Sequence, residues 1–326
     1  MFKALTRLVA LLSVSAHLCV PSLRAAVPPQ SEAFRAFYNL EYDRAISLFE
    51  KAVAEQPDSP DAWNHLSQAI FSRRLYLEGA LQSEFVGKSN SFLRRPKVVM
   101  PLDEERRFLD ANSRAMRLSL DRLAKDPNDA AALYALGIAY AHSANFRFLC
   151  QKAYIDALRD ATRARNLHNR LRQVQPGYPD AILIPAMYDY IGGSLPVMVR
   201  ILASMAGFSG NRSRGIAGLQ RAVLEGKKTG VEARVLLCLV YNREGKPAMA
   251  VPLMAELVEA FPRNYLYRSE SVLLLARAGR KAEALRAVEG IEQMKRDGAP
   301  ELASMDLAKV KRLRELVEQR LRGENE

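Results

Sequence analysis

The chain has 326 residues, of which 49% are hydrophobic and 26% are charged, and its formal net charge is +12. This hydrophobic content excludes an intrinsically disordered chain, which would lack the apolar surface needed for a core. The positive charge is compatible with an acidic or anionic partner, but net charge concerns association and not fold.

The first 26 residues have the pattern of a signal peptide. Two basic residues precede an apolar run from Leu8 to Val20, and the small residues Ala25 and Ala26 follow it. The run is too short for a membrane-spanning helix, which needs about 20 residues. A mitochondrial presequence would be amphipathic and arginine-rich instead. We therefore expect cleavage near Ala26 and an exported protein, either periplasmic or secreted.

A regular spacing of alanine, aromatic and proline residues follows this segment. Ala45, Phe49, Ala52 and Pro57 stand at offsets 0, 4, 7 and 12. Small alanines let two helices approach closely, the aromatic ring fills the space between them, and proline stops the second helix. This spacing is typical of the second half of a tetratricopeptide repeat.

The same positions recur later in the chain with the period of this repeat. Ala250 and Leu257 return 34 residues later as Ala284 and Ile291, and 34 residues is the repeat length of the class. We therefore predict an all-α tetratricopeptide-repeat solenoid, a superhelix of antiparallel helix pairs, over residues 27–298. About six units are expected, beginning near Val27, Pro60, Ala130, Pro179, Val231 and Tyr265.

Insertions and a terminal helix modify this array. The insertions are expected near 82–101, 143–152 and 192–209. Residues 299–326 should form a capping helix, because a terminal repeat has no neighbour to cover its apolar face. The apolar residues that share one face of this helix are Leu307, Val310, Leu313, Val317 and Leu321.

The third insertion contains an apolar helix from Leu195 to Ala206, interrupted only by Arg200. At about 12 residues it cannot cross a bilayer. The sequence around it has a distinctive block, formed by Leu195-Pro196, Gly207-Phe208-Ser209-Gly210-Asn211-Arg212, Gly215, Leu219, Ala222, Glu232-Ala233 and Tyr241-Asn242-Arg243-Glu244. Over residues 191–264 this block resembles the eukaryotic inclusion-body-clearance family of tetratricopeptide-repeat proteins and related bacterial repeat proteins. The resemblance implies a non-catalytic interaction protein.

No pattern of residues suited to catalysis stands out. His65, His142 and His168 fall on separate predicted helices and outside any HExxH motif. The glycines at 210 and 215 have the spacing of a phosphate loop, but Ile216-Ala217 replace the lysine and the hydroxyl residue. A weak anion site at the start of the following helix is the alternative to a simple turn. We predict no enzyme, no cofactor and no metal site.

The first helix of each pair should line the concave side of the superhelix, where positions 2, 5, 9 and 12 would form a partner-binding groove. These positions give Asn64, Gln68, Phe71, Tyr134, Ile138, Leu183, Met187, Tyr190, Val235, Leu239 and Asn242. They are mostly apolar, so we expect a protein or peptide partner that presents an amphipathic or apolar segment. In the competing arrangement, which we slightly favour, the chain's own segment Leu195 to Ala206 fills the groove.

These features predict a non-catalytic, exported scaffold or adaptor. The alternative is a peripheral membrane protein that binds anionic lipid through the apolar insertion and two basic stretches, Arg159 to Arg172 and Lys309 to Arg314. Aromatic residues are not interleaved with these stretches as a stacking platform would require, so no nucleic-acid partner is expected.

Overall fold

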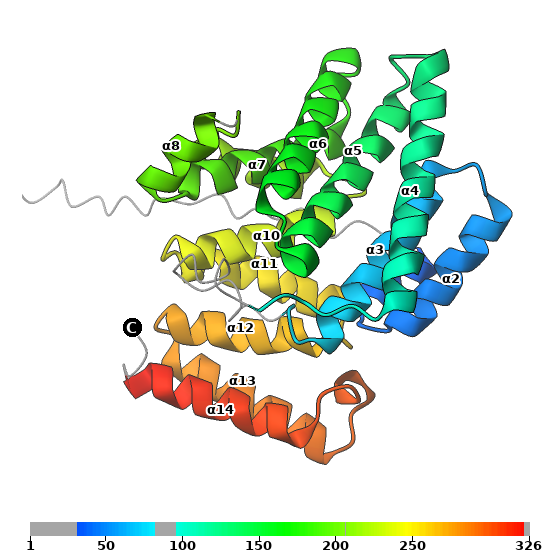
Figure 1. Ribbon diagram of the computed structural model, residues 1–326. Coiled ribbons are helices and arrows are strands. Elements are labelled where there is room, and N and C mark those ends of the chain that lie inside the picture. The colour runs from blue at the N-terminus through cyan, green and yellow to red at the C-terminus, as the bar shows by residue number, and fades with distance from the viewer. Residues whose placement is uncertain (1–30, 82–95, 206, 323–326) are drawn as a thin grey trace, which may run out of the picture.

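The computed structural model describes residues 31–81, 96–205 and 207–322, and most of these residues are helical (Figure 1). No strand occurs in this part of the chain. The predicted signal peptide, residues 1–26, lies outside the described residues. The all-α solenoid expected from the repeat spacing is confirmed.

The helices follow one another in antiparallel pairs, each packed against the next along the chain, except that α7 packs against α9 and carries α8 between them. Their bounds are α1 Glu32–Tyr38, α2 Tyr42–Glu55, α3 Pro60–Leu77, α4 Leu102–Lys125, α5 Ala130–Phe146, α6 Tyr154–Val174, α7 Leu183–Ser194, α8 Val197–Met205, α9 Arg212–Glu225, α10 Gly230–Arg243, α11 Pro247–Ala260, α12 Tyr265–Arg277, α13 Lys281–Arg296 and α14 Leu307–Arg322.

Side-chain caps begin several first helices at the residues where the sequence predicted a new unit. Ser59, Asp129 and Asn264 precede α3, α5 and α12, and each accepts a hydrogen bond from a backbone N–H of the first turn. Such a cap satisfies an amide that the helix itself leaves unpaired and is worth about 1 kcal/mol.

The repeat positions form the core between paired helices. Ala45, Ala250 and Ala284 are all 0% exposed, and Phe49 is buried beside them in the same continuous core. Because alanine occupies little volume, the paired helices approach closely and the aromatic ring fills the remaining space. The spacing found in the sequence therefore has its expected physical role.

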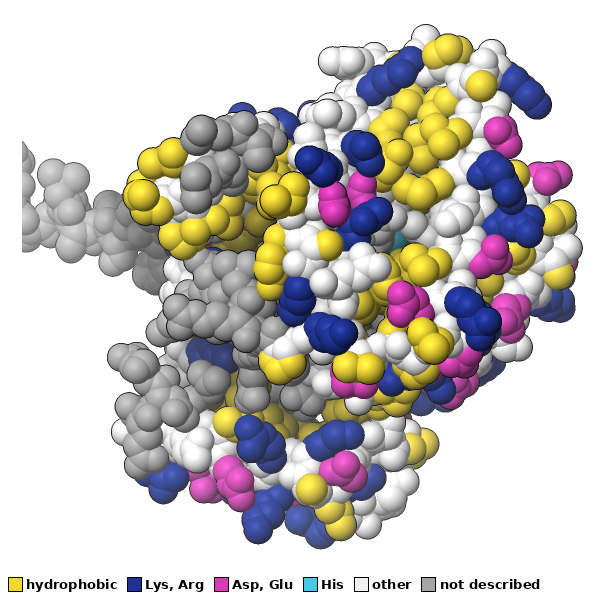
Figure 2. Space-filling model, in the orientation of Figure 1, with side chains coloured by type: hydrophobic (Ala, Val, Ile, Leu, Met, Phe, Trp, Pro, Cys, Tyr) yellow, Lys and Arg dark blue, Asp and Glu magenta, His cyan; other side chains and the backbone are white. Residues whose placement is uncertain are grey.

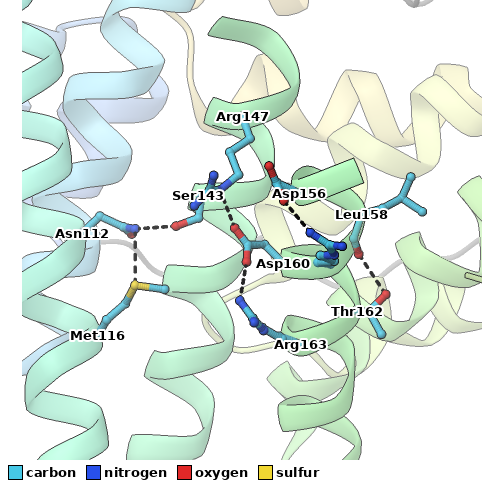
Figure 3. Close-up of polar contacts among 10 residues, drawn as sticks. Asn112, Met116, Ser143, Arg147, Asp156, Leu158, Asp160, Thr162 and Arg163 are labelled. Carbon is cyan, nitrogen blue, oxygen red and sulfur yellow. Dashed lines mark hydrogen bonds and ion pairs between the residues drawn. The ribbon is translucent and has the colours of Figure 1, made fainter. Parts of the chain in front are cut away.

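A buried carboxylate joins the long helix α6 to Arg147, the residue that directly follows α5 (Figure 3). Asp160 is only 4% exposed, and its carboxylate accepts hydrogen bonds from Arg147 at 2.8 Å and from Arg163 at 3.1 Å. On the other side of α5, Asn112 Nδ2 donates to Ser143 Oγ at 2.9 Å and so ties α4 to α5. Part of the basic stretch predicted on α6 is thus neutralised within the fold.

The superhelix turns far enough for its first helix to contact its later repeats. Tyr38 Oη donates a hydrogen bond to Glu232 Oε1 of α10. Asn264 Nδ2 donates to Tyr38 O at 2.7 Å, and Asn39 Oδ1 accepts from Arg263 N at 2.9 Å. These bonds join residues 194 to 226 positions apart. The curved rod therefore closes on itself, which the repeat spacing did not predict.

The apolar insertion forms α8, and it does not fill the concave side. Val197, Met198 and Ile201 are 61%, 73% and 51% exposed, and Figure 2 shows hydrophobic surface gathered over this helix. No described residue of α8 lines the concave pocket. The arrangement in which this segment fills the groove is therefore wrong. No helix within the described ranges is long and apolar enough to span a membrane.

Close backbone contacts at glycines join the two ends of the α8 insertion. A Cβ at Gly215 would lie 2.5 Å from Tyr190 N, and a Cβ at Gly193 would lie 2.2 Å from Arg212 N. The end of α7 and the start of α9 thus touch through their backbones, because no side chain stands between them. The intervening α8 is left to project from a tight hairpin instead of folding back into the superhelix.

The last helix covers the end of the array, as a capping helix would. Val310, Leu313 and Val317 of α14 are buried against α12 and α13. Leu307 is 68% exposed, so its predicted place on the buried face is wrong: it is the first residue of the helix and lies beyond the packed surface. The side chain of Leu321 lies outside the described residues.

Candidate binding pocket on the concave face

A pocket of about 380 Å³ lies where the first and last repeats meet. Its walls come from α1, α3, α10, α12 and α14, together with nearby residues of α2 and α11. Four of these five helices, all but α14, are the first members of their pairs. The pocket therefore lies on the concave side of the superhelix. Its apolar lining includes Phe37, Tyr42, Leu81, Val235, Leu236, Leu239, Met254, Leu266, Leu273, Met305, Leu313 and Leu316.

A carboxyl group from α10 stands in this apolar wall. Glu232 Oε1 accepts the hydrogen bond from Tyr38, whereas Oε2 is buried without a partner in the described part of the chain. Burial raises the pKa of Glu232, although hydrogen bonding from Tyr38, from the backbone and from the nearby Gln68 side chain opposes this effect. Burial, followed by the nearby charge of Glu232, raises the pKa of Tyr38 well above its ordinary value. Tyr38 therefore remains a donor, and its bond holds the Glu232 carboxyl group in the wall of the pocket.

The α14 helix adds positive charge to the pocket. Lys309 Nζ lies 5.1 Å from the ring centroid of Tyr265 and 3.6 Å from Asp306 Oδ2. Arg312 also lines the pocket, is exposed, and makes no ion pair with another described residue. Because Glu270 lines the pocket as well as Glu232, the chamber is apolar with charged groups of both signs at its edge. This lining suits a ligand that has an apolar face, with acidic groups placed near Lys309 and Arg312.

Three of the predicted groove residues line this pocket. Gln68 comes from α3, and Val235 and Leu239 come from α10. Gln68 and Leu239 are position 9 of their units and Val235 is position 5, so the repeat offsets place all three on the same side of the superhelix.

The other predicted groove residues lie outside the pocket lining, several of them between helices. Asn64 is buried and its Nδ2 donates to Ala135 O at 2.9 Å. Phe71 packs against the ring of Phe108, with centroids 5.3 Å apart. The remaining members are Tyr134, Ile138, Leu183, Met187, Tyr190 and Asn242, of which Tyr134, Leu183 and Tyr190 are buried and Ile138, Met187 and Asn242 are partly buried.

The repeat offsets also identify pocket residues that the sequence analysis omitted. Glu232 is position 2 of the unit that begins near Val231, and Leu266 and Leu273 are positions 2 and 9 of the unit that begins at Tyr265. Applying the offsets to every unit would have found them. The contributions of α1 and α14 had no such signal, because they depend on closure of the superhelix.

Each of the three histidines contacts a different neighbouring group. The ring of His65 packs on Phe34 with centroids 4.8 Å apart, and His142 Nδ1 lies 3.0 Å from Ser67 Oγ. His168 Nε2 lies 3.3 Å from Tyr134 O. Across residues 31–81, 96–205 and 207–322, no three side chains of the metal-binding types gather in one place.

Comparison with known proteins identifies the repeat. Residues 32–84 match the family model described as tetratricopeptide repeat. Residues 32–84 are therefore tetratricopeptide-repeat sequence. The matched repeat supplies α1 and α3, and with them Tyr38 and Gln68 of the pocket.

Two solved structures are similar to this chain. A thermophilic TPR protein in Thermus thermophilus has 17% sequence identity and a TM-score of 0.41, with 74% of this chain and 95% of that chain covered. Yeast Tom70 has 11% identity and a TM-score of 0.31, with 81% of this chain and 68% of that chain covered. A comparison with curated proteins found no match.

Proposed function

We propose that this protein is an exported, non-catalytic scaffold that binds an amphipathic or apolar segment of a partner protein in the concave pocket. Tetratricopeptide repeats form surfaces for protein interaction, and here the concave surface is hollow and largely apolar. The observation that carries the proposal is the 380 Å³ pocket, which combines an apolar lining with Lys309 and Arg312.

The proposed ligand follows from the chemistry of the pocket. Burying apolar side chains of a partner segment is favourable by about 25 cal/mol per Å² of surface removed from water. Acidic residues beside that apolar face would lie near Lys309 and Arg312.

Site-specific photocrosslinking in the native host tests this proposal. A photoreactive amino acid is placed at Leu239, inside the pocket, or at Leu120, which is 50% exposed on α4 and outside the pocket lining. We expect a defined adduct from position 239 only. Adding Val235→Glu, which puts a charge into the apolar wall, should abolish that adduct.

The control distinguishes pocket binding from general surface contact. Equal adducts from positions 239 and 120, or an adduct that persists with Val235→Glu in a folded protein, would contradict the proposal. Circular dichroism of the Val235→Glu variant establishes that the helices are retained.

Export is a separate part of the proposal, motivated by the charge and apolar pattern of residues 1–26. Cell fractionation followed by N-terminal sequencing should find the protein outside the cytoplasm, beginning near Ala26 or Val27. An uncut N-terminus in the cytoplasmic fraction would contradict export and leave pocket binding unaffected.

The exposed face of α8 supports a second candidate function, peripheral contact with a membrane surface. Val197, Met198 and Ile201 are apolar and largely exposed on a nine-residue helix, a size suited to lying in the lipid interface and not to crossing it. In liposome flotation, Met198→Ser/Ile201→Ser should reduce binding to anionic vesicles. Unchanged flotation, or none for the wild type at low salt, would exclude this candidate.

A further inference from the structure

A second cavity, of about 420 Å³, lies between α6 and α9, and α7 forms its floor. Because α6 and α9 are the second helices of neighbouring pairs, they run in the same direction on the outer side of the superhelix. Four arginines line this cavity, Arg165 and Arg172 from α6 and Arg214 and Arg221 from α9. Asp189 of α7 is the single acidic residue in the lining.

Small residues create the hollow between these arginines. A Cβ at Gly218 would lie 2.7 Å from the Cβ of Ala186, so α9 and α7 touch at this point. Ala217 and Pro185 continue the floor on either side. Ile182, just before α7, and Asn169 of α6 complete the lining, and the long arginine side chains form its walls.

The arginines form two pairs along the cavity. Arg165 Cζ lies 4.6 Å from the ring centroid of Tyr188, and Arg214 binds the next residue of α7, so these two arginines lie at the same level. Arg172 and Arg221 each follow seven residues later on their own helices. Seven residues correspond to about 10 Å of helix, which places the second pair about 10 Å from the first.

Much of this charge is not neutralised within the protein. Arg165 and Arg172 make no ion pair in the described part of the chain. Arg221 is paired with Glu225 at 2.7 Å, and Arg214 donates to both oxygens of the lining carboxylate, at 2.5 and 2.8 Å. Two of the four arginines are thus paired with an acid and two are not, and the cavity has an excess of guanidinium groups that an anion would stabilise.

Phosphate fits this arrangement because its oxygens accept two parallel hydrogen bonds from one guanidinium group. Two arginine pairs about 10 Å apart favour an anion with more than one phosphate group, and the size of the hollow favours a small molecule or a headgroup. We propose that this outer cavity binds a multiply phosphorylated anion, either free in solution or as a lipid headgroup. The site lies apart from the concave pocket and goes beyond the scaffold function.

Titration calorimetry of the whole protein with inorganic tripolyphosphate tests the site. Arg165→Ala/Arg172→Ala should weaken binding about tenfold or more, because it removes two guanidinium groups that lack an ion pair. The matched control is Arg159→Ala/Arg170→Ala, which removes the same charge from the same helix outside the cavity lining. It should change the affinity by no more than about threefold, since exposed charges are screened by salt.

Sedimentation with vesicles of phosphatidylcholine, with or without cardiolipin, distinguishes the two sources of phosphate. Cardiolipin-dependent binding that Arg165→Ala/Arg172→Ala abolishes and the control variant retains identifies a lipid headgroup. Tripolyphosphate binding with the same variant dependence, and no vesicle binding, identifies a soluble anion. The proposal is overturned if the wild type binds neither, or if the two double variants lose binding equally.

Discussion

At the scale of single residues, positions with close backbone contacts and positions of buried histidines tolerate the fewest residue types. Gly215 and His168 belong to neither proposed site, yet each occupies a place that few other side chains tolerate. Their consequences are measurable as free energies of unfolding.

Gly215→Ala should destabilise the protein although alanine is the better helix former. Its Cβ would lie 2.5 Å from Tyr190 N, a backbone atom that cannot rotate away. We expect a loss of about 2 kcal/mol or more, typical of overpacking. Gly290→Ala in α13 is the control, because a Cβ there meets nothing within 4 Å, and it should stabilise by about 0.5–1 kcal/mol. Urea unfolding measures both, and equal effects would contradict this account.

His168 should make stability depend on pH between about 6.5 and 4. The side chain is 0% exposed, and burial lowers its pKa to about 4. The unfolded chain, with an ordinary pKa near 6.5, therefore binds the proton first, and stability falls as pH falls through this range. The cost reaches about 3 kcal/mol at the low end.

The variant His168→Gln isolates this contribution. Glutamine removes the titration, so the destabilisation caused by the substitution should be smaller at pH 4.5 than at pH 7.5, by about 2–3 kcal/mol. Urea unfolding of both proteins at the two pH values provides the four free energies. A difference that does not change with pH would show that His168 titrates normally in the folded protein.

At the scale of helices, α14 shows how one face of an element is selected by packing. Val317 is 0% exposed and Leu307 is 68% exposed on the same helix. Val317→Ala should cost about 1–3 kcal/mol because it leaves a cavity, whereas Leu307→Ala should change stability by less than about 0.5 kcal/mol. Thermal unfolding of the two variants provides the comparison. A larger loss of stability from Leu307→Ala than from Val317→Ala would contradict the assignment of the buried face of α14.

The sequence predicted where helices occur better than it predicted how they pack. It placed a helix at Leu195 to Ala206, and α8 runs Val197–Met205. The apolar character of this helix suggested burial, whereas the backbone contacts at Gly193 and Gly215 direct it outward. Such contacts involve residues without side chains, so hydrophobic periodicity carries no trace of them.

The candidate pocket was predictable only in part, for a related reason. Repeat offsets identify the residues that each first helix turns inward, which is how Gln68, Val235 and Leu239 were found. They do not specify how far the superhelix turns in total. The contact of Tyr38 with Glu232 depends on the accumulated rotation of every intervening pair, including the insertions.

At the scale of the whole molecule, closure should link the stability of distant repeats. Asn39→Ala removes the acceptor for Arg263 N and leaves that amide unpaired, at a cost of about 1–3 kcal/mol. Hydrogen exchange should therefore accelerate in α1 and also at the start of α12. Asn128→Ala, in a turn whose side chain contacts α6, is the control. Acceleration confined to α1 would mean that closure contributes nothing to the later repeats.

The pocket takes one wall from α1 and another from α14, so it exists only when both termini of the array are in place. A shortened chain that lost either helix would keep most of its repeats and still lack a complete receptor. A bound ligand would in turn raise the free energy of unfolding of the whole closed superhelix and not of one repeat. The reason is that a ligand that binds only the folded form adds its binding free energy to the global folding equilibrium. Only molecules in which both ends of the array are folded would therefore bind the partner.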